Sequence, residues 1–417
     1  MNVLWITNIT FPEAQALLTG KGSLTASGGW LLGAAGALVD QPDVELTIAS
    51  LSPLVNKLTF LKGEKISYYV LPYGKGNHKR NKNYGSLWKQ VRDAVTPDVV
   101  HLHGTEYTQG LAYVEACGSQ NVCVSIQGLV SVYSRYYYCG FSRTEIHLAT
   151  TPASIVRGGI LSGYRDFVRR GECEKELLRK VNHIIGRTSW DHSHAWAINP
   201  KAQYHHGGET LRAEFYSGEI WNYEKCIPHS IFLSQGGVPL KGLQQVLRAL
   251  PLVLRHYPDT IIRIAGKDIS SLNNLRDYLL FSDYGKLIRK IIKKNNLQEH
   301  VRFLGYLDGE KMRKEYLQSN IFICPSSIEN SPNSLGEAQL LGVPVLASYV
   351  GGSMDMMRGD EEHLYRYEET EMLAHKIVRL FDCKDRINTD KMREEALKRH
   401  DPQNNLKELI ELYRKIC

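Results

Sequence analysis

The chain has 417 residues, of which 43% are hydrophobic and 23% charged, so it is long enough for two ordinary domains and has the composition of a folded globular protein. Its formal net charge of +7 suits phosphorylated ligands or an anionic membrane surface without selecting either, and we expect no nucleic-acid partner. Eight cysteines without a CxxC pair or a repeated spacing argue against a zinc site and a disulfide framework, and they favour a reducing, cytoplasmic compartment.

The N-terminal segment MNVLWITNITFPEAQ lacks a basic region and predicts a buried strand rather than a signal peptide. No apolar run approaches the ~20 residues of a membrane-spanning helix. Short β-rich runs alternate with longer helical patterns, which predicts parallel sheets built from βαβ units. In the first half these runs are VLWIT (3–7), VELTIAS (44–50), ISYYVLP (66–72), DVVHLHG (98–104), VCVSIQG (122–128) and HIIGRTS (183–189).

The alternation of β-rich runs and helical patterns begins again in the second half, after a polar, turn-rich junction at residues 199–230. We therefore predict an α/β fold with two Rossmann-like domains, residues 1–210 and 211–398, facing across a cleft. A capped amphipathic helix within residues 399–417 is expected to cross back and pack near the first domain. The strand runs of the second half are SIFLSQGG (230–237), IIRIAG (261–266), VRFLGYL (301–307), IFICPSS (321–327) and VPVLASYVGG (343–352).

Ligands of doubly wound sheets bind beyond the carboxyl ends of the strands, and two features of the first half lie there. Gly28 and Gly29 open a helix whose amides could approach a phosphate, although a glycine pair is often only a packing solution and GxGxxG is absent. His101 and His103 end the fourth strand run. We expect their side chains to point to opposite faces, with one buried in the structure and His103 facing a ligand; a purely structural His103 is the alternative.

In the second half, SQGGVPLKGLQQVLRALPLVL (234–254) predicts a strand end, a glycine turn that includes Gly237, and a helix with apolar residues at 243, 246, 247 and 250. Lys241 would then stand beside the helix N-terminus, where a cation opposes the helix dipole unless an anion joins it. A phosphate would satisfy both the lysine and the amides. An exposed loop lysine is the alternative.

The segment SSIENSPNSLGEAQLLGVPVLAS (326–348) places Glu329 in a turn after a buried strand and Glu337 in the first turn of the next helix. Ser334 and Glu337 also fit an S-x-x-E capping box, in which Glu337 would only stabilise the helix end. That alternative does not account for Glu329. Two carboxylates near Lys241 could bind sugar hydroxyls while the lysine balances a diphosphate, so the set points to a nucleotide sugar.

Nearly the whole chain resembles the retaining glycosyltransferases of family 4, the group 1 type with the two-domain GT-B fold. The likeness is strongest over residues 301–352, where the strand, the helix, the E-x7-E motif of Glu329 and Glu337, and the following G-V-P-V strand come in the family's order. The resemblance implies hexosyl transfer from a nucleotide sugar, with a UDP- or GDP-sugar expected, no other cofactor and no metal.

The resemblance also implies roles for individual residues. Glu329 would contact the hexose near the reacting carbon, Lys241 would neutralise the diphosphate, and His103 would border the reaction centre, which makes these three the catalytic candidates. The expected donor-binding residues are Glu337, which would hold the ribose, and Gly28, Gly29, Gly237, Asn333, Ser334 and Leu335.

Three features depart from the family pattern. The arginine that usually precedes the lysine is missing from QGGVPLK (235–241), and Arg187 and Arg212 are candidates to replace it. Gln127 stands where many relatives have a histidine, and glutamine can orient a hydroxyl but cannot act as a general base. The segment YHHGGETLR (204–212) replaces the usual asparagine–glycine turn.

The acceptor is expected to be a glycan or lipid-linked saccharide of polysaccharide biosynthesis, such as a capsule or lipopolysaccharide. Gln127, Tyr133 and Arg135 are the residues expected on the acceptor side. The basic run within residues 163–180 could meet the inner face of a membrane, or could be a solvated helix face with acidic partners. A GT-B protein that binds sugars without transfer, and a nucleotide-sugar epimerase, remain as other hypotheses.

Overall fold

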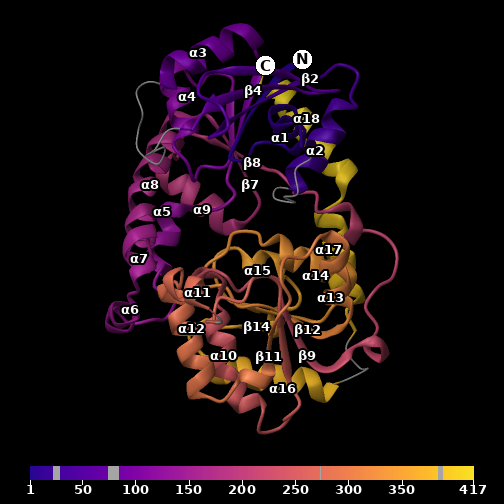
Figure 1. The fold of residues 1–417 in the computed structure, drawn as a ribbon. Coiled ribbons are helices and arrows are strands. Elements are labelled where there is room, and N and C mark those ends of the chain that lie inside the picture. Colours follow the sequence, from indigo (N-terminus) through magenta and orange to yellow (C-terminus); the bar gives the residue numbers. More distant parts are fainter. Residues whose placement is uncertain (22–28, 74–83, 273, 384–387) are drawn as a thin grey trace. The chain divides into compact units, whose positions relative to one another are not determined.

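The computed structural model describes residues 1–21, 29–73, 84–272, 274–383 and 388–417. The chain forms two compact units (Figure 1). Unit 1 comprises Met1–Val132, Asp166–Leu211 and His400–Cys417, and unit 2 comprises Tyr133–Arg165 and Arg212–Arg399. No helix of the described residues is long and apolar enough to cross a membrane.

Unit 1 is built on an eight-stranded sheet in the order β3-β4-β2-β1-β5-β6-β7-β8, parallel except for the β3–β4 pair. From β4 onward this is the doubly wound Rossmann order, in which the strand order reverses between β1 and β5. The strands are β1 Asn2–Thr7, β2 Glu45–Ser52, β3 Thr59–Lys62, β4 Ser67–Pro72, β5 Val99–His103, β6 Val122–Ser125, β7 His183–Gly186 and β8 Gln203–His206.

Helices cover both faces of this sheet. Alternate residues of each strand point to opposite faces, so they belong to two separate apolar clusters. Leu4 and Ile6 of β1 enter one cluster, and Val3 and Trp5 enter the other. The first cluster includes residues of α3 Tyr84–Val95, α4 Gln109–Cys117, α8 Ile160–Lys180 and α9 Ser189–Ile198. The second includes residues of α1 Pro12–Thr19, α2 Gly29–Val39 and α18 Pro402–Ile416.

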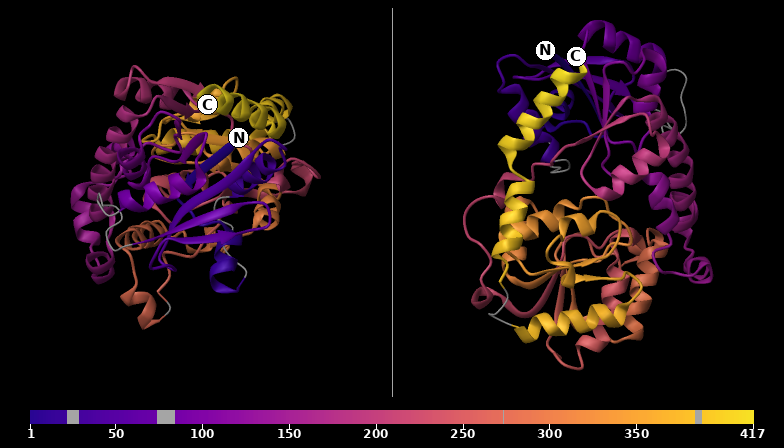
Figure 2. Two further views of the ribbon diagram at one scale, coloured as in Figure 1. Left: turned by 90° about the horizontal axis from the view of Figure 1, so that it is seen from above. Right: turned by 180° about the vertical axis from the view of Figure 1, so that it is seen from behind.

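The C-terminal helix α18 is tied to the sheet of unit 1 by one buried hydroxyl group. Trp5 Nε1 donates to Tyr413 Oη at 2.9 Å, and Tyr413 Oη lies 2.6 Å from His101 Nδ1. His101 Nε2 lies 2.6 Å from Ser125 Oγ, so the chain runs Trp5, Tyr413, His101, Ser125. The N- and C-termini lie close together in this unit (Figure 2), and Asp43 contacts both the Met1 ammonium and Arg414.

Unit 2 is built on a six-stranded parallel sheet in the order β11-β10-β9-β12-β13-β14, again with the doubly wound order and a reversal between β9 and β12. Its strands are β9 Ile227–Leu233, β10 Ile261–Ile264, β11 Val301–Phe303, β12 Ser319–Cys324, β13 Val345–Ser348 and β14 Leu364–Tyr365. Its longer helices are α10 Leu243–Val253, α12 Asp283–Lys294, α13 Gly309–Leu317, α14 Asn333–Leu341, α16 Thr370–Cys383 and α17 Asp390–Arg399.

Residues 133–165 lie in unit 2, although we expected residues 1–210 to form one domain. This segment contains α6 Arg143–Ala149 and α7 Pro152–Arg157. Ile146 and Ala149 of α6 enter the apolar core of unit 2. The Asp283 carboxylate accepts a hydrogen bond of 2.7 Å from the Ile160 amide, which fixes the end of the segment. Burial of this apolar face therefore overrides its position in the sequence.

All eleven strand runs expected from the sequence coincide with strands of the two sheets. Three strands were not expected: β3, β8 and the two-residue β14. In β8 the sequence QYHH carries polar residues at an edge of the sheet, so it lacks the apolar pattern of a central strand. The expected C-terminal amphipathic helix is α18, which starts after the N-cap Asp401 with Pro402 at its first position.

The buried hydrogen-bond chain at Tyr413 predicts a measurable loss of stability when its hydroxyl group is removed. Tyr413→Phe would leave the Trp5 N–H and His101 Nδ1 buried without this partner, and should lower the free energy of unfolding by about 1–3 kcal/mol. Urea denaturation measures the difference. Tyr73→Phe removes the hydroxyl of an exposed tyrosine of the same unit and should change the value by less than about 0.5 kcal/mol. Equal effects of the two changes would contradict the anchoring role.

Candidate functional site

The predicted donor-side lysine lies where the strand order of unit 2 reverses. Lys241 ends the 3-10 helix Pro239–Lys241 that follows β9, and Gly242 caps α10 with φ of +75°. A Cβ atom at Gly242 would overlap the carbonyl oxygen of Pro325, so only glycine lets the loop after β9 approach the loop after β12 this closely. The buried residues of α10 include Leu243, Val246, Leu247 and Leu250, as the periodicity predicted.

Lys241 and Glu329 form an ion pair between these two loops. Ser326 Oγ donates a second hydrogen bond of 2.8 Å to the Glu329 carboxylate. The backbone of Glu329 is fixed as well, because its carbonyl oxygen accepts from the Gly352 amide at 3.0 Å. Burial alone would lower the pKa of Lys241, but the charge and hydrogen bond of Glu329 outweigh it and raise the pKa above its usual value. Lys241 is therefore protonated, and its side chain is 32% exposed.

Glu337 is held by Arg212 in a bidentate pair, with distances of 2.7 Å from Nε and 2.8 Å from Nη2. The carboxylate is almost fully buried, and burial raises its pKa although Arg212 acts to lower it. The capping-box alternative for Ser334 and Glu337 is wrong, because α14 begins after Pro332 and no side chain caps it. Glu337 is thus a buried carboxylate in charge balance with Arg212.

The other predicted donor-side residues of unit 2 lie around this pair of carboxylates. Asn333, Ser334 and Leu335 form the first turn of α14, where the initial amides of a helix have no partner inside the helix. The Leu335 amide, however, already donates to the Pro332 carbonyl at 2.9 Å. Gly237 lies in the turn after β9, and a Cβ there would meet no atom within 4 Å, so no close approach in the structure requires glycine at this position.

In unit 1, the expectation that His101 and His103 point to opposite faces is wrong. Their rings stack with centroids 3.8 Å apart, because side chains two residues apart on a strand share a face. His101 is the structural histidine, and burial lowers its pKa to about 3. His103 is also buried, and neither of its ring nitrogens has a hydrogen-bond partner among the described residues. Burial, and then His101 and Arg187, lower the pKa of His103 well below its usual value, so it is a neutral group and a weak base at pH 7.

The remaining predicted residues are divided between the two units. Gly29 is the first residue of α2, whereas Gly28 lies outside the described residues. Gln127 follows β6 in unit 1 and is half-buried. Tyr133 and Arg135 belong to the segment 133–165 of unit 2, and the Arg135 side chain is exposed.

Both candidates for the missing arginine are already paired with carboxylates. Arg212 binds Glu337 in unit 2, as described above. Arg187 lies in unit 1, with Nε 3.4 Å from Glu209 and Nη1 donating to the Ile126 carbonyl at 3.0 Å. The role of Arg212 as a partner of Glu337 was not predicted, because 125 residues separate the two in the sequence. Among the described residues, no group of three or more His, Cys, Asp or Glu side chains is placed to hold a metal ion.

One family model matches the part of the chain that contains this site. Residues 230–400, which contain Lys241, Glu329 and Glu337, match the family model of the glycosyl transferases group 1. The phosphatidyl-myo-inositol mannosyltransferase of Mycobacterium leprae is 26% identical over 208 residues, which are 48% of this chain and 50% of that protein. The first curated relatives are matched over half of their own length or less.

Solved structures match the whole chain in fold. Sucrose-phosphate synthase from Thermosynechococcus elongatus has a TM-score of 0.70 at 15% identity, covering 99% of this chain and 98% of that one. Anabaena Alr3699/HepE in complex with UDP has a TM-score of 0.66 at 15% identity and covers 100% of both chains. The chain therefore has the GT-B fold, and its residues 230–400 match the model of the glycosyl transferases group 1 family.

Proposed function

We propose that the protein is a retaining, metal-independent hexosyltransferase that moves a hexose from a nucleotide sugar to a glycan or lipid-linked glycan acceptor in polysaccharide biosynthesis. The observation that carries the proposal is the Lys241–Glu329 pair at the point where the strand order of unit 2 reverses, inside the segment that matches the glycosyltransferase family. Relatives named as mannosyltransferases and a structural neighbour in complex with UDP support it.

The charges of the site suit a donor that carries both phosphates and hydroxyls. Lys241 and the first amides of α14 would receive the diphosphate, and Glu337 would accept hydrogen bonds from the ribose hydroxyls. Glu329 would do the same for the hexose. Each carboxylate is paired with a cation in the structure, so an anionic donor would not meet two uncompensated negative charges. The donor phosphates would compete with Glu329 for Lys241.

For the reaction, we propose substitution on one face of the sugar. The bond between the anomeric carbon and the phosphate oxygen breaks while the acceptor oxygen bonds to the same face of that carbon. The leaving phosphate oxygen accepts the proton of the acceptor hydroxyl. Lys241 would stabilise the charge that develops on the leaving group, which is the contribution expected to dominate the rate. Because the ammonium group supplies this positive charge, transfer should not require a metal ion. A catalytic role for His103 remains a prediction.

Turnover of donors tests the proposal. Slow donor hydrolysis should occur with one sugar of a panel of UDP-, GDP- and ADP-sugars, and should persist in EDTA. Lys241→Met and Glu329→Gln should each lower kcat/KM on the order of 10²–10³-fold, because each removes a group that meets charge near the reacting carbon. The exposed residues Lys311 and Glu310 provide matched controls, and Lys311→Met and Glu310→Gln should keep normal turnover.

Two results would overturn this assignment. Saturable donor binding without hydrolysis or transfer to any acceptor mixture would favour a non-catalytic binding protein. Release of an isomerised nucleotide sugar without an acceptor would favour an epimerase.

We also propose that the protein contacts the inner face of a membrane from the cytoplasm, where a lipid-linked acceptor would lie. The basic run of α8 does not favour this contact, because Arg169 and Arg170 pair with Asp166, and Lys175 pairs with Glu172. None of the eight cysteines forms a disulfide bond, as suits a reducing compartment.

A different surface has the composition of a membrane contact. Leu148, Ile155 and Val156 of α6 and α7 are 71%, 75% and 84% exposed. The basic residues on and beside these helices are also exposed, and Lys286 Nζ donates to the Leu148 carbonyl at 2.9 Å. Exposed apolar side chains with cations on and beside the same helices favour an anionic lipid surface. The exposed basic residues are Arg143, Arg157, Lys286 and Lys290.

Vesicle binding tests this contact. The protein should sediment with vesicles that contain anionic phosphatidylglycerol and less with pure phosphatidylcholine, and the binding should weaken as salt rises. The double change Ile155→Asp and Val156→Asp should reduce the bound fraction several-fold. Leu54→Asp, at a 55% exposed position of unit 1, is the control and should bind normally. Equal sedimentation of all three proteins would contradict the proposal.

A further inference from the structure

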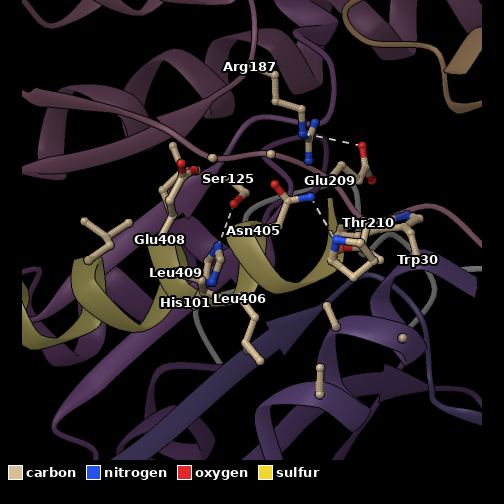
Figure 3. Close-up of a pocket in the computed structure, with 18 of the residues that line it drawn as sticks. Trp30, His101, Ser125, Arg187, Glu209, Thr210, Asn405, Leu406, Glu408 and Leu409 are labelled. Carbon is tan, nitrogen blue, oxygen red and sulfur yellow. Dashed lines mark hydrogen bonds and ion pairs between the residues drawn. The ribbon is translucent and has the colours of Figure 1, made fainter. Parts of the chain in front are cut away.

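Unit 1 encloses a cavity of ≈ 120 Å³ that the proposed donor site does not use. It lies between α2, α18, the strands β1 and β5–β7, and the segment 206–210, and Figure 3 shows Trp30, Arg187, Glu209 and Asn405 around it. One water needs roughly 10–15 Å³ of such space, so the cavity has room for several waters or for one small ring. All of its lining residues belong to unit 1.

One polar side chain of the cavity wall is left without a partner. His103 is 5% exposed, lines the cavity and has no hydrogen bond at either ring nitrogen. Its neighbour His101 differs, because Tyr413 and Ser125 occupy both of its nitrogens. Buried polar groups in native proteins are almost always hydrogen-bonded, and the described residues supply no such partner for the imidazole of His103. As a neutral ring it offers one donor and one acceptor.

The rest of the wall is apolar and aromatic. The ring of Trp5 lies 4.3 Å from that of His103, and the ring of Trp30 lies 6.0 Å from it. Aromatic rings of this kind stack on the apolar faces of flat or ring-shaped ligands while hydrogen bonds fix the edges. The other aliphatic side chains of the lining are Ala34, Ala37, Ile185, Leu406, Leu409 and Leu412.

The charges of the wall argue against an anionic ligand. Apart from histidines, the charged lining residues are Arg187, Glu209 and Glu408, which is one cation against two carboxylates. The single cation is paired with Glu209 at 3.4 Å. A phosphate would therefore meet no uncompensated positive charge from these residues, whereas hydroxyl groups can both donate to carboxylates and accept from an imidazole N–H.

We propose that this cavity is a second binding site that takes a neutral, hydroxylated ring, a sugar or a cyclic polyol, against Trp5 and Trp30 with hydrogen bonds to His103. The site lies in unit 1, apart from the donor-site residues of unit 2, although its wall includes His103, for which a catalytic role is also predicted. Its ligand would touch residues 206–210 and Asn405, next to two of the points at which the chain passes between the units, 211/212 and 399/400. These two segments already contact each other, since His400 Nδ1 lies 2.7 Å from the Glu209 carbonyl oxygen.

The α2 helix offers a matched pair of variants. A Cβ at Gly33 or at Gly36 would meet no atom within 4 Å, so both positions accept a side chain, and both lie within the helix. Gly33 lines the cavity and Gly36 does not. Gly33→Leu should therefore fill the cavity while Gly36→Leu leaves it open, and both changes favour the helix by removing a glycine from it.

Titrations of the full chain test the proposal, with tryptophan fluorescence and saturation-transfer NMR as the readouts. The probes are methyl α-D-glucopyranoside, methyl α-D-mannopyranoside and myo-inositol, with inorganic phosphate as the anionic comparison. At least one neutral probe should bind saturably without a nucleotide. Gly33→Leu and His103→Phe should each weaken its binding at least tenfold, whereas Gly36→Leu and the donor-site variant Glu329→Gln should not change it.

Three results would overturn the proposal. The first is an absence of saturable binding by all three neutral probes, which would leave water as the occupant of the cavity. The second is binding that survives Gly33→Leu, which would place the ligand elsewhere. The third is tighter binding of phosphate than of any neutral probe. Loss of donor hydrolysis in Lys241→Met, with neutral-probe binding intact, would leave this site and the proposed transferase site standing independently.

Discussion

The ion pair between Lys241 and Glu329 is the interaction on which the account of this protein depends. The two residues lie 88 positions apart in the sequence and meet only because the doubly wound order of unit 2 places β9 beside β12. Their carboxyl ends then share one edge of the sheet, and Gly242 lets the two loops approach. The burial of apolar strands sets the strand order of the sheet. This order brings two polar loops together at the carboxyl ends of β9 and β12.

The second pair, Arg212 with Glu337, completes a site in which both carboxylates are neutralised before any ligand binds. A buried ion pair contributes little net stability, because the loss of hydration offsets most of the attraction between the charges. In this structure the cation of each pair fixes the direction of the carboxylate. Arg212 is the first residue of unit 2 after a chain crossing, so Glu337 is paired with the residue at which the chain re-enters the unit.

Much of the fold could be predicted from the sequence because buried parallel strands carry continuous apolar runs, and all eleven expected runs are strands. Lys241 and Glu329 could be selected because they lie in the turns that follow two of these runs, and Glu337 because the E-x7-E motif pairs it with Glu329. The placement of residues 133–165 could not be predicted, because the apolar faces of α6 and α8 do not specify which sheet they will cover. The stacking of His101 and His103 follows from the strand period of two, which places residues i and i+2 on one face. The cavity of unit 1 could not be foreseen, since α2 and α18 are about as far apart in the sequence as two helices of this chain can be.

The affinity of the ligand-free protein for a nucleoside diphosphate tests the central claim most directly, because it reports whether Glu329 competes for Lys241. Calorimetric titration of UDP and GDP into the wild-type protein and into Glu329→Gln provides the comparison. The account predicts that Glu329→Gln binds the preferred diphosphate more tightly, roughly 3- to 10-fold or ~1 kcal/mol, since the ammonium group is released and a negative charge is removed. Unchanged or weaker binding by Glu329→Gln would contradict a diphosphate site at Lys241.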